Sequence, residues 1–291
     1  MGLCLPIAEY MIINIKPTVF IFLTILTFSL KTSAVQNENS NPQSETGYET
    51  VRNFKDAKRA LPVIFDMLDK PMTLYCSCPI IFTQSSSNKK GYMVRPDDCG
   101  YKIRQDKKRA NRIEAEHIMP AYDFGHQMKC WQSKGRRQNC SENDAQFQRM
   151  EGDLHNLYPS IGEVNADRKN YHYGDWNAKP GMYGKCPMVV DNQLKLAQPP
   201  HSSRGIVARA TLYMAERYHI KISAEQQKLF LSWNKMYPPT PNECLRNKLI
   251  ASVQGNENHF VSRECEFKGI NTQLTKTQYD TLKAFLKSLH R

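Results

Sequence analysis

Several patterns that mark common protein classes are missing from this sequence of 291 residues. No His-Glu-x-x-His motif occurs, so a helical zinc site of that kind is not expected. Cys76 and Cys78 are separated by one residue instead of two, and no partner pair accompanies them, which makes a zinc ribbon or finger a weak alternative. Acidic residues are also scarce, with 28 Asp and Glu against 40 Lys and Arg, so the formal net charge is +12.

This excess of basic residues favours a polyanionic partner. Lys and Arg that neutralise phosphates release counterions, which gives a sequence-independent affinity that weakens steeply with salt. The alternative is a basic surface without a particular partner. No segment resembles a module that reads base edges, so binding to nucleic acid is not expected to depend on base sequence.

The N-terminal region has the pattern of a secretory signal peptide. Lys16 precedes an apolar run at residues 17–30, and small residues follow at 32–34. The run is too short to be a comfortable membrane span. We therefore expect a signal peptide at residues 1–34, a polar and disordered lead-in at 35–49, and no membrane segment in the mature chain.

The cysteines agree with export. Nine are present, and Cys4 falls within the expected leader. The remaining eight form an even set in an exported chain, which implies disulfides, although the sequence does not fix their pairing. One local pair is expected, Cys130 with Cys140, because closing that loop would hold Arg136 in place.

The most informative stretch spans residues 112–170. A β-compatible segment runs into Glu116 and His117 and ends before Pro120, which has no amide hydrogen for a strand. A short extended piece at 154–159 is followed by Ser160 and Glu163, which are spaced as a capping box. The expected helix carries Val164, Asn165 and Arg168.

These residues suggest a metal site beside a general base. Side chains next to each other on a strand point to opposite faces, so Glu116 and His117 can share a site only if the strand ends or bulges there. A carboxylate, the amide oxygen of Asn165 and water would suit a hard cation such as Mg²⁺. An imidazole with a pKa of about 6.5 can take a proton from water at neutral pH. Asn156 is the rival for Asn165, which we prefer because it lies on the expected helix.

Four blocks occur in order along the chain: EHIMPAYDFGHQMKCWQSKGRRQNC, DLHNLYPSIGEVNADR, RGIVARATLYM and WNKMYPPTPNECLRNKLIASVQGNENHFV. Together they resemble bacterial endonuclease I, the periplasmic or secreted nucleases of the ββα-metal (His-Me finger) superfamily. The resemblance covers roughly residues 50–267. It implies an α+β fold, a mixed single domain built around a ββα-metal motif with several helices and disulfides.

The resemblance also implies roles for single residues. His117 would be the general base, and Glu116 and Asn165 would hold Mg²⁺ or another divalent cation such as Mn²⁺ or Ca²⁺. Arg136, on a loop, would stabilise charge on the phosphate. Arg168 lies three residues beyond Asn165 on the same helix face, and we expect it to be a further phosphate contact.

The sequence thus predicts an exported, metal-dependent and sequence-nonspecific endonuclease, periplasmic or secreted and monomeric. Its substrate would be DNA, with RNA as a second candidate, and its products would carry 5′-phosphate ends. One alternative is a non-catalytic protein that binds nucleic acid or another polyanion on the same fold. Another is a disulfide-framed structural protein in which the Glu-His pair is incidental.

The rest of the chain supplies mainly helices. Apolar periodicity and capping signals predict them at residues 54–68, interrupted by Pro62, and at 202–219, 223–236, 241–255 and 275–289. Short strands are expected at 73–75 and 80–82. The last helix belongs to a C-terminal extension, residues 268–291, which is either a docking helix or a partner site.

Two further segments leave alternatives open. The charged segment at 101–112 either lines a phosphate groove or forms a solvated face. Residues 171–184 should form a loop whose aromatic side chains either stack on bases or pack the loop itself: Tyr171, Tyr173, Trp176 and Tyr183.

Overall fold

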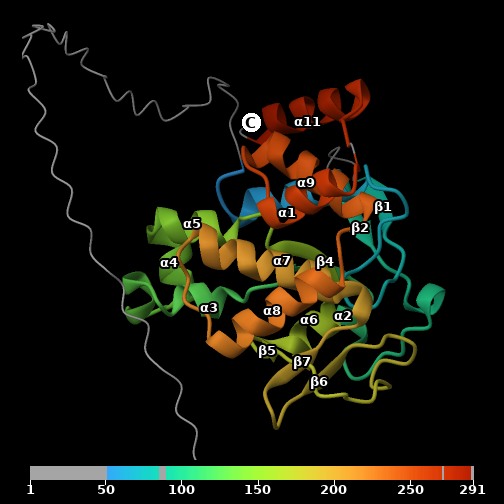
Figure 1. Cartoon of the computed structure of the whole chain (residues 1–291), viewed down its shortest axis with the longest axis vertical. Helices are drawn as coiled ribbons and strands as arrows, with labels where there is room; N and C mark the ends of the chain where they lie inside the picture. Colours follow the sequence, from blue (N-terminus) through green and yellow to red (C-terminus); the bar gives the residue numbers. More distant parts are fainter. Residues whose placement is uncertain (1–50, 85–89, 271, 290–291) are drawn as a thin grey trace, which may run out of the picture. The chain divides into compact units, whose positions relative to one another are not determined.

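The structure is a computed structural model, and it describes residues 51–84, 90–270 and 272–289. The expected signal peptide and lead-in lie outside these residues. Within them, the chain is a mixed α+β domain with many helices and three small sheets (Figure 1). None of the helices in this part of the chain is both long and apolar enough to cross a membrane.

Two antiparallel strands and a short helix lie at the centre. Strand β3 (Ile113–His117) pairs with β4 (Leu157–Ile161), so that Ile113 lies opposite Ile161 and His117 opposite Leu157. Helix α6 (Gly162–Arg168) follows β4 directly. The two expected extended segments and the helix that carries Asn165 are therefore present as a β-β-α unit.

The other elements surround this unit. The helices are α1 (Phe54–Phe65), α2 (Lys107–Ala110), α3 (Ala121–Gly125), α4 (Arg137–Asn143), α5 (Ala145–Glu151), α7 (His201–Arg217), α8 (Ala224–Met236), α9 (Pro241–Gln254), α10 (His259–Phe267) and α11 (Lys276–Leu289). Strands β1 (Ile81–Gln84) and β2 (Lys90–Met93) form an antiparallel pair. In the third sheet β7 (Leu196–Gln198) lies between β5 (His172–Tyr173), which is parallel to it, and β6 (Val189–Asp191), which is antiparallel.

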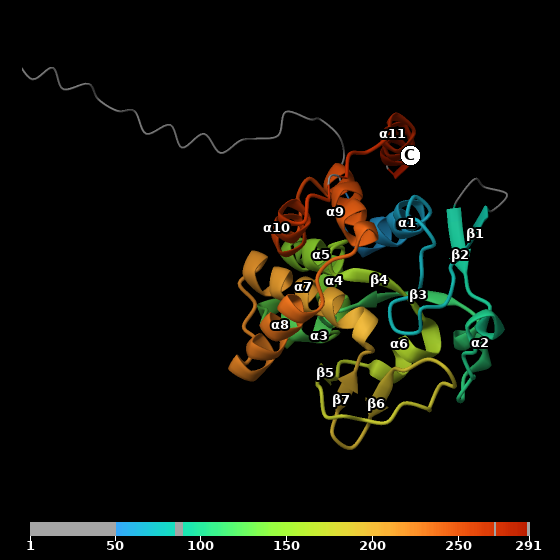
Figure 2. The ribbon, with the colours of Figure 1, turned by 45° about the vertical axis from the view of Figure 1, so that its right-hand side comes forward.

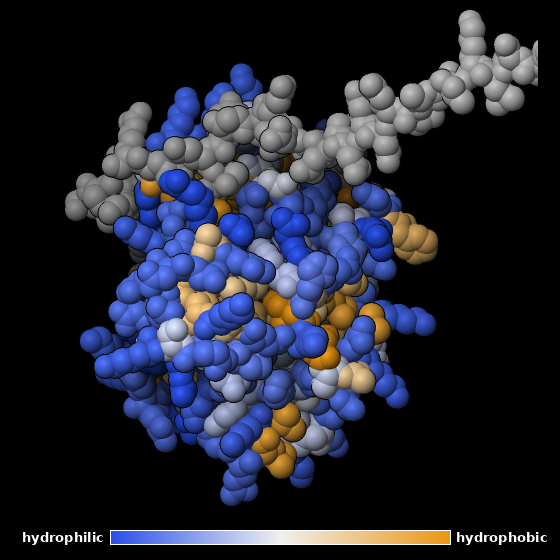
Figure 3. Space-filling view, turned by 90° about the vertical axis from the view of Figure 1, so that its left-hand side faces the viewer, coloured by the Kyte–Doolittle hydropathy of each residue, from blue (hydrophilic) through white to orange (hydrophobic). Residues whose placement is uncertain are grey.

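Helix packing places the central unit between two groups of elements. Helices α1, α9 and α11 contact one another and lie on one side of the β3–β4 pair, while α6 and the β5–β7–β6 sheet lie on the other (Figures 1 and 2). Apolar side chains of α1, β4, α6 and α8 are part of the main core, among them Leu61, Phe65, Leu157, Val164 and Trp233. The face that carries α3, α4 and α5, on the left of Figure 1, is largely hydrophilic around a smaller apolar area (Figure 3).

Local capping explains where several helices begin. Asn53 caps α1 by accepting a hydrogen bond from Asp56 N. Ser223 caps α8 by accepting one from Gln226 N, as the sequence predicts for that helix. Helix α9 begins after Thr240 and ends at Gly255, whose φ of 88° is the left-handed conformation that glycine adopts readily.

The effect of Pro62 differs from the prediction. Helix α1 runs through Pro62 without a break and ends at Phe65, before the expected residue 68. Proline removes one backbone hydrogen bond, but the buried face of α1 holds the helix against the core through Ala57, Leu61 and Ile64. Packing therefore outweighs the local penalty.

The C-terminal helix α11 docks on α1. Thr275 and Gln278 form the predicted capping box, because each side chain accepts a hydrogen bond from the backbone N–H of the other. Leu282, Leu286 and Leu289 are buried, and Arg59 on α1 donates to the last carbonyls of α11. Of the two expectations for this extension, the structure supports a docking helix.

Four disulfides cross-link the described chain. The predicted bond between Cys130 and Cys140 is present. Cys76 bonds to Cys186 and Cys78 to Cys99, which rules out the zinc alternative for the close pair, and Cys244 bonds to Cys265. The expected strand at 73–75 is wrong: these residues form a tight turn in which Thr73 bonds to Cys78 through backbone and side chain.

Candidate active site

A basic groove of about 1020 Å³ runs beside the β-β-α unit. Its walls come from α1, β2, β3, α6 and the loop before α4. Six basic residues line it besides Arg168: Lys58, Lys90, Arg109, Arg136, Arg137 and Lys169. Two carboxylates, Glu114 and Glu116, lie among them, and His117 and Asn165 line the same groove. The structure thus brings together the four residues to which the sequence assigned catalysis or metal binding: Glu116, His117, Arg136 and Asn165.

The end of β3 lets Glu116 and His117 reach one site. Glu114 and Glu116 point to the same face of the strand because they are two residues apart. His117 is the last residue of β3, and its carbonyl and that of Ile118 accept hydrogen bonds from Arg168 at 2.9 and 2.6 Å. These bonds hold the backbone at the point where the strand ends. Strand β3 therefore ends at Glu116 and His117, which is the condition under which the two side chains can share a site.

The His117 ring is held in its neutral form. Its Nε2 lies 2.8 Å from the carbonyl oxygen of Glu151, which can only accept, so Nε2 carries the proton and Nδ1 has a free lone pair. The Phe54 ring packs against the imidazole at a centroid distance of 4.7 Å. Burial, with help from the charge of Arg137, lowers the pKa of His117 to about 3. The imidazole is therefore uncharged at neutral pH.

Glu116 is almost completely buried, with 1% of its surface exposed. Its Oε1 accepts a hydrogen bond from the Tyr75 hydroxyl at 2.8 Å and lies 3.2 Å from Arg168 Nη1. Burial raises the pKa of Glu116 to about 7, against the opposing effects of Arg168 and Tyr75. Oε2 has no hydrogen-bond partner among the described residues, and the Glu116 side chain lines the groove.

Asn165 presents a second free oxygen. Its Nδ2 donates to Glu114 Oε2 at 2.9 Å, and no described donor contacts its Oδ1. Two uncommitted oxygens, one from a carboxylate and one from an amide, with space for water, match the ligands of a hard divalent cation. No cluster of three or more His, Cys, Asp or Glu suited to a metal occurs in the described ranges. The donor set therefore fits one ion held mainly by water, and it does not resemble a closed structural site.

Helix α6 begins differently from the prediction. Ser160 is buried and its hydroxyl does not cap the helix, and Glu163 reaches across to accept the backbone N–H groups of residues 104–106. The predicted capping box is therefore wrong, although the helix is correct. Gly162 is required at the first position, since an added Cβ would lie 2.7 Å from the Arg109 carbonyl oxygen.

The disulfide-closed loop presents two arginines to the groove. Arg136 has a φ of 43°, unusual for a residue other than glycine, and its exposed side chain has no partner in the described residues. Arg137, which the sequence analysis did not single out, donates to Glu151 Oε1 at 2.8 Å and lies over the Phe54 ring. The loop thus holds Arg136 free beside the groove, as expected.

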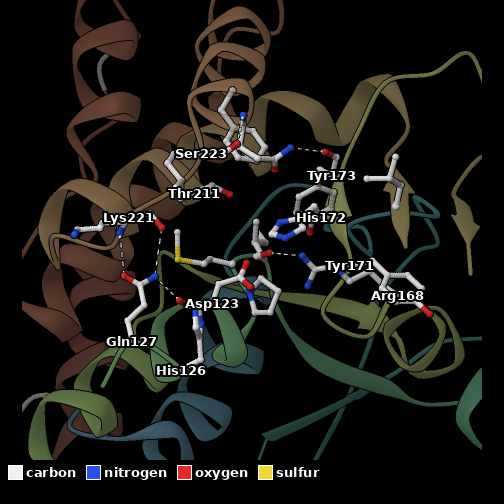
Figure 4. A pocket seen from close by; sticks show the side chains of 17 residues that line it. Asp123, His126, Gln127, Arg168, Tyr171, His172, Tyr173, Thr211, Lys221 and Ser223 are labelled. Carbon is white, nitrogen blue, oxygen red and sulfur yellow. Dashed lines mark hydrogen bonds between the residues drawn. The ribbon is translucent and has the colours of Figure 1, made fainter. Parts of the chain in front are cut away.

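Arg168 does not have the predicted role of phosphate contact. Only 1% of its surface is exposed, and its guanidinium is bonded to the end of β3 and paired with Glu116. On its other side lies a second cavity of about 320 Å³, where Asp123 and His172 are neighbours and Tyr173 stacks on the guanidinium at 4.5 Å (Figure 4). Arg168 is therefore part of the wall between the two cavities.

Several residues of the site were not predicted from the sequence. Glu114 could have been found, because a residue two positions before Glu116 shares its strand face. Tyr75 and Glu151 lie 41 and 34 residues from their partners in the site, and no local pattern marks them. Asn156, the rival of Asn165, instead ties its chain segment to Met119 through both backbone groups.

The structure decides part of the alternatives left open for residues 101–112 and 171–184. Arg109 and Arg112 of the charged segment pair with Glu114, and Arg109 lines the groove. In the aromatic loop Tyr173 and Tyr183 are buried, so these two rings pack the protein and cannot stack on bases.

Comparisons of the sequence with a protein-family model and with known proteins agree with one another. The model of the endonuclease I family matches residues 29–265. An extracellular deoxyribonuclease of Aeromonas hydrophila is 44% identical over 221 residues, which cover 75% of this chain and 91% of the relative. A periplasmic deoxyribonuclease of Aeromonas hydrophila is 45% identical over 75% of this chain and 89% of its own length. Endonuclease-1 of Buchnera aphidicola subsp. Baizongia pistaciae is 42% identical over 87% of this chain and 97% of the relative.

Proposed function

The chain belongs to the endonuclease I family, and we propose that it is a metal-dependent endonuclease that hydrolyses phosphodiester bonds of DNA in the groove beside β3 and α6. Its relatives are named as extracellular and periplasmic nucleases, and the protein is an exported endonuclease, periplasmic or secreted. RNA is a second candidate substrate. The active species is proposed to be a monomer.

One observation carries the proposal. Glu116 Oε2, Asn165 Oδ1 and His117 Nδ1 have no partner in the described chain, and all three side chains line one basic groove. Two oxygens for a cation and a neutral base are the parts that hydrolysis of a phosphodiester requires. The surrounding basic side chains would neutralise the phosphates on either side of the scissile bond.

The chain's own residues would act as follows. Arg168 and Tyr75 hold Glu116, and the free oxygens of Glu116 and Asn165 can bind Mg²⁺, or Mn²⁺ or Ca²⁺. The bound ion would polarise the phosphate and stabilise the leaving 3′ oxygen. His117 Nδ1 takes the proton from the attacking water, while the Glu151 carbonyl keeps the ring oriented through Nε2. Arg136 stabilises charge on the phosphate, and the product carries a 5′-phosphate.

Recognition should depend on the backbone of the nucleic acid. Besides the buried Arg168, six basic side chains line the groove, where they can contact phosphates of any sequence. The two buried tyrosines of the 171–184 loop, Tyr173 and Tyr183, cannot reach bases. Cleavage should therefore be nonspecific in sequence and should weaken as salt rises.

The test uses the oxidised protein, residues 35–291, with supercoiled plasmid and with RNA, in Mg²⁺ and in chelator. We expect cleavage in Mg²⁺ and none in chelator, with products that a 5′-phosphate-dependent exonuclease degrades. Tight, salt-sensitive binding without cleavage under any divalent cation would instead establish the non-catalytic binding alternative. Cleavage that persists in chelator would refute the metal site.

A further inference from the structure

Glu114 lies beside the proposed metal ligands without a role in the reaction described above. It is on the same face of β3 as Glu116, and both of its oxygens are engaged. Oε1 accepts from Arg109 Nε at 3.0 Å and from Arg112 Nε at 2.8 Å. Oε2 accepts from Arg109 Nη2 and from Asn165 Nδ2, the latter at 2.9 Å.

This last bond decides which end of the Asn165 amide faces the groove. The oxygen and the nitrogen of an amide are nearly the same size, but only the oxygen can bind a cation. A carboxylate can only accept hydrogen bonds. The amide nitrogen of Asn165 therefore faces Glu114, and Asn165 Oδ1 points away from it. The hydrogen bond from Asn165 Nδ2 to Glu114 Oε2 therefore fixes the orientation of the Asn165 amide.

The two arginines complete the arrangement. They neutralise the Glu114 carboxylate and occupy its oxygens, so that Glu114 is not itself available to a cation. Without Glu114, both guanidiniums would be free to donate to Asn165 Oδ1, and they would compete with the ion for it.

We propose that Glu114 is a positioning residue, which fixes the Asn165 amide with its oxygen toward a divalent cation while Arg109 and Arg112 hold the Glu114 carboxylate in place. The inference rests on the proposed function, because it concerns the same metal site. Partners that orient a metal ligand typically contribute about 10- to 100-fold to metal affinity.

The experiment compares Mn²⁺ binding, without nucleic acid, by following the electron paramagnetic resonance of free Mn²⁺ during titration. In Glu114→Gln the new amide nitrogen would face Asn165, so the Asn165 amide should flip and present its nitrogen to the ion. We expect a loss of about 10- to 100-fold in Mn²⁺ affinity with little change in Tm. Asp167→Ala is the matched control, since Asp167 also pairs with an arginine and lies on α6 but does not contact Asn165. It should keep the affinity of the wild type.

Adding Asn165→Asp to Glu114→Gln reverses donor and acceptor. The Gln nitrogen can then donate to one Asp oxygen and leave the other for the ion, and the site keeps the net charge of the wild type. We expect this double variant to recover most of the lost affinity. An affinity of Glu114→Gln within twofold of wild type, or a double variant no better than Glu114→Gln, would overturn the inference. If wild type binds no Mn²⁺, the proposed metal site itself fails, and the inference with it.

Discussion

Arg168 should stabilise the protein through the buried carboxylate of Glu116. Replacing it with Met keeps most of its apolar volume and removes the cation. The Arg168 and Glu116 side chains are 1% and 2% exposed, and removing one partner of such a pair costs about 3–5 kcal/mol. The carbonyls of His117 and Ile118 also lose their donors, at about 1–3 kcal/mol each where no water replaces them.

We therefore expect Arg168→Met to lower the free energy of unfolding by about 5 kcal/mol at pH 8. For a domain of this size that corresponds to a fall in Tm of roughly 10–20 °C. The loss should be smaller at pH 5.5, because burial raises the pKa of Glu116 to about 7 and a protonated carboxyl needs no cation. Cleavage should fall as well, since Glu116 and the end of β3 lose their support.

The assay is urea unfolding at pH 8 and pH 5.5 for wild type and Arg168→Met. Arg204→Met serves as the matched control, because Arg204 is also buried but its partner Asp175 is 39% exposed and can be solvated. Its effect should be smaller and should not change between the two pH values. A loss below about 1 kcal/mol for Arg168→Met at pH 8 would refute the role given to Arg168.

Three other perturbations have defined outcomes. Burial lowers the pKa of His155 to about 4, so between pH 6.5 and 4 the unfolded chain binds more protons than the folded one, and the unfolding free energy should fall by about 3 kcal/mol over that interval. In urea unfolding, the free energy of unfolding of His155→Gln should fall less than that of the wild type between pH 6.5 and pH 4. An equal fall in both proteins would show that His155 is not the group responsible. Replacing Cys130 and Cys140 with Ser should cut plasmid cleavage several-fold by releasing the Arg136 loop, whereas the same change at Cys244 and Cys265, which do not line the groove, should not. Ending the chain at residue 270 should lower Tm by several degrees, because it uncovers the surface of α1 on which Leu282, Leu286 and Leu289 are buried; an unchanged Tm would show that α11 contributes nothing to stability.

Much of the candidate site could be predicted because its key residues lie within short segments that each have a local sequence pattern. The pair Glu116 and His117 lies at the end of one strand, and Asn165 lies on the helix that directly follows the partner strand. Helices α8, α9 and α11 were also predictable, because their caps are formed by side chains within the same turn.

The errors have a common cause in contacts between distant segments. Glu163 has the spacing of a capping residue, but the N–H groups of residues 104–106 recruit it instead. From its position on the helix, Arg168 was predicted to contact phosphate at the surface. Instead its side chain is buried, where it pairs with Glu116 and donates to the His117 carbonyl at the end of β3. Cys76 bonds to a cysteine 110 residues away, a pairing that no local pattern indicates.

The most direct test of the central claim is the single-turnover rate of cleavage by His117→Ala in Mg²⁺, at protein concentrations that bind all of the DNA. His126→Ala is the control, since His126 is exposed and does not line the groove. We expect His117→Ala to fold and to bind DNA and Mn²⁺ as the wild type does, but to cleave at least about 100-fold more slowly and to recover when imidazole is added. A rate for His117→Ala within tenfold of the control would contradict the assignment of His117 as the general base.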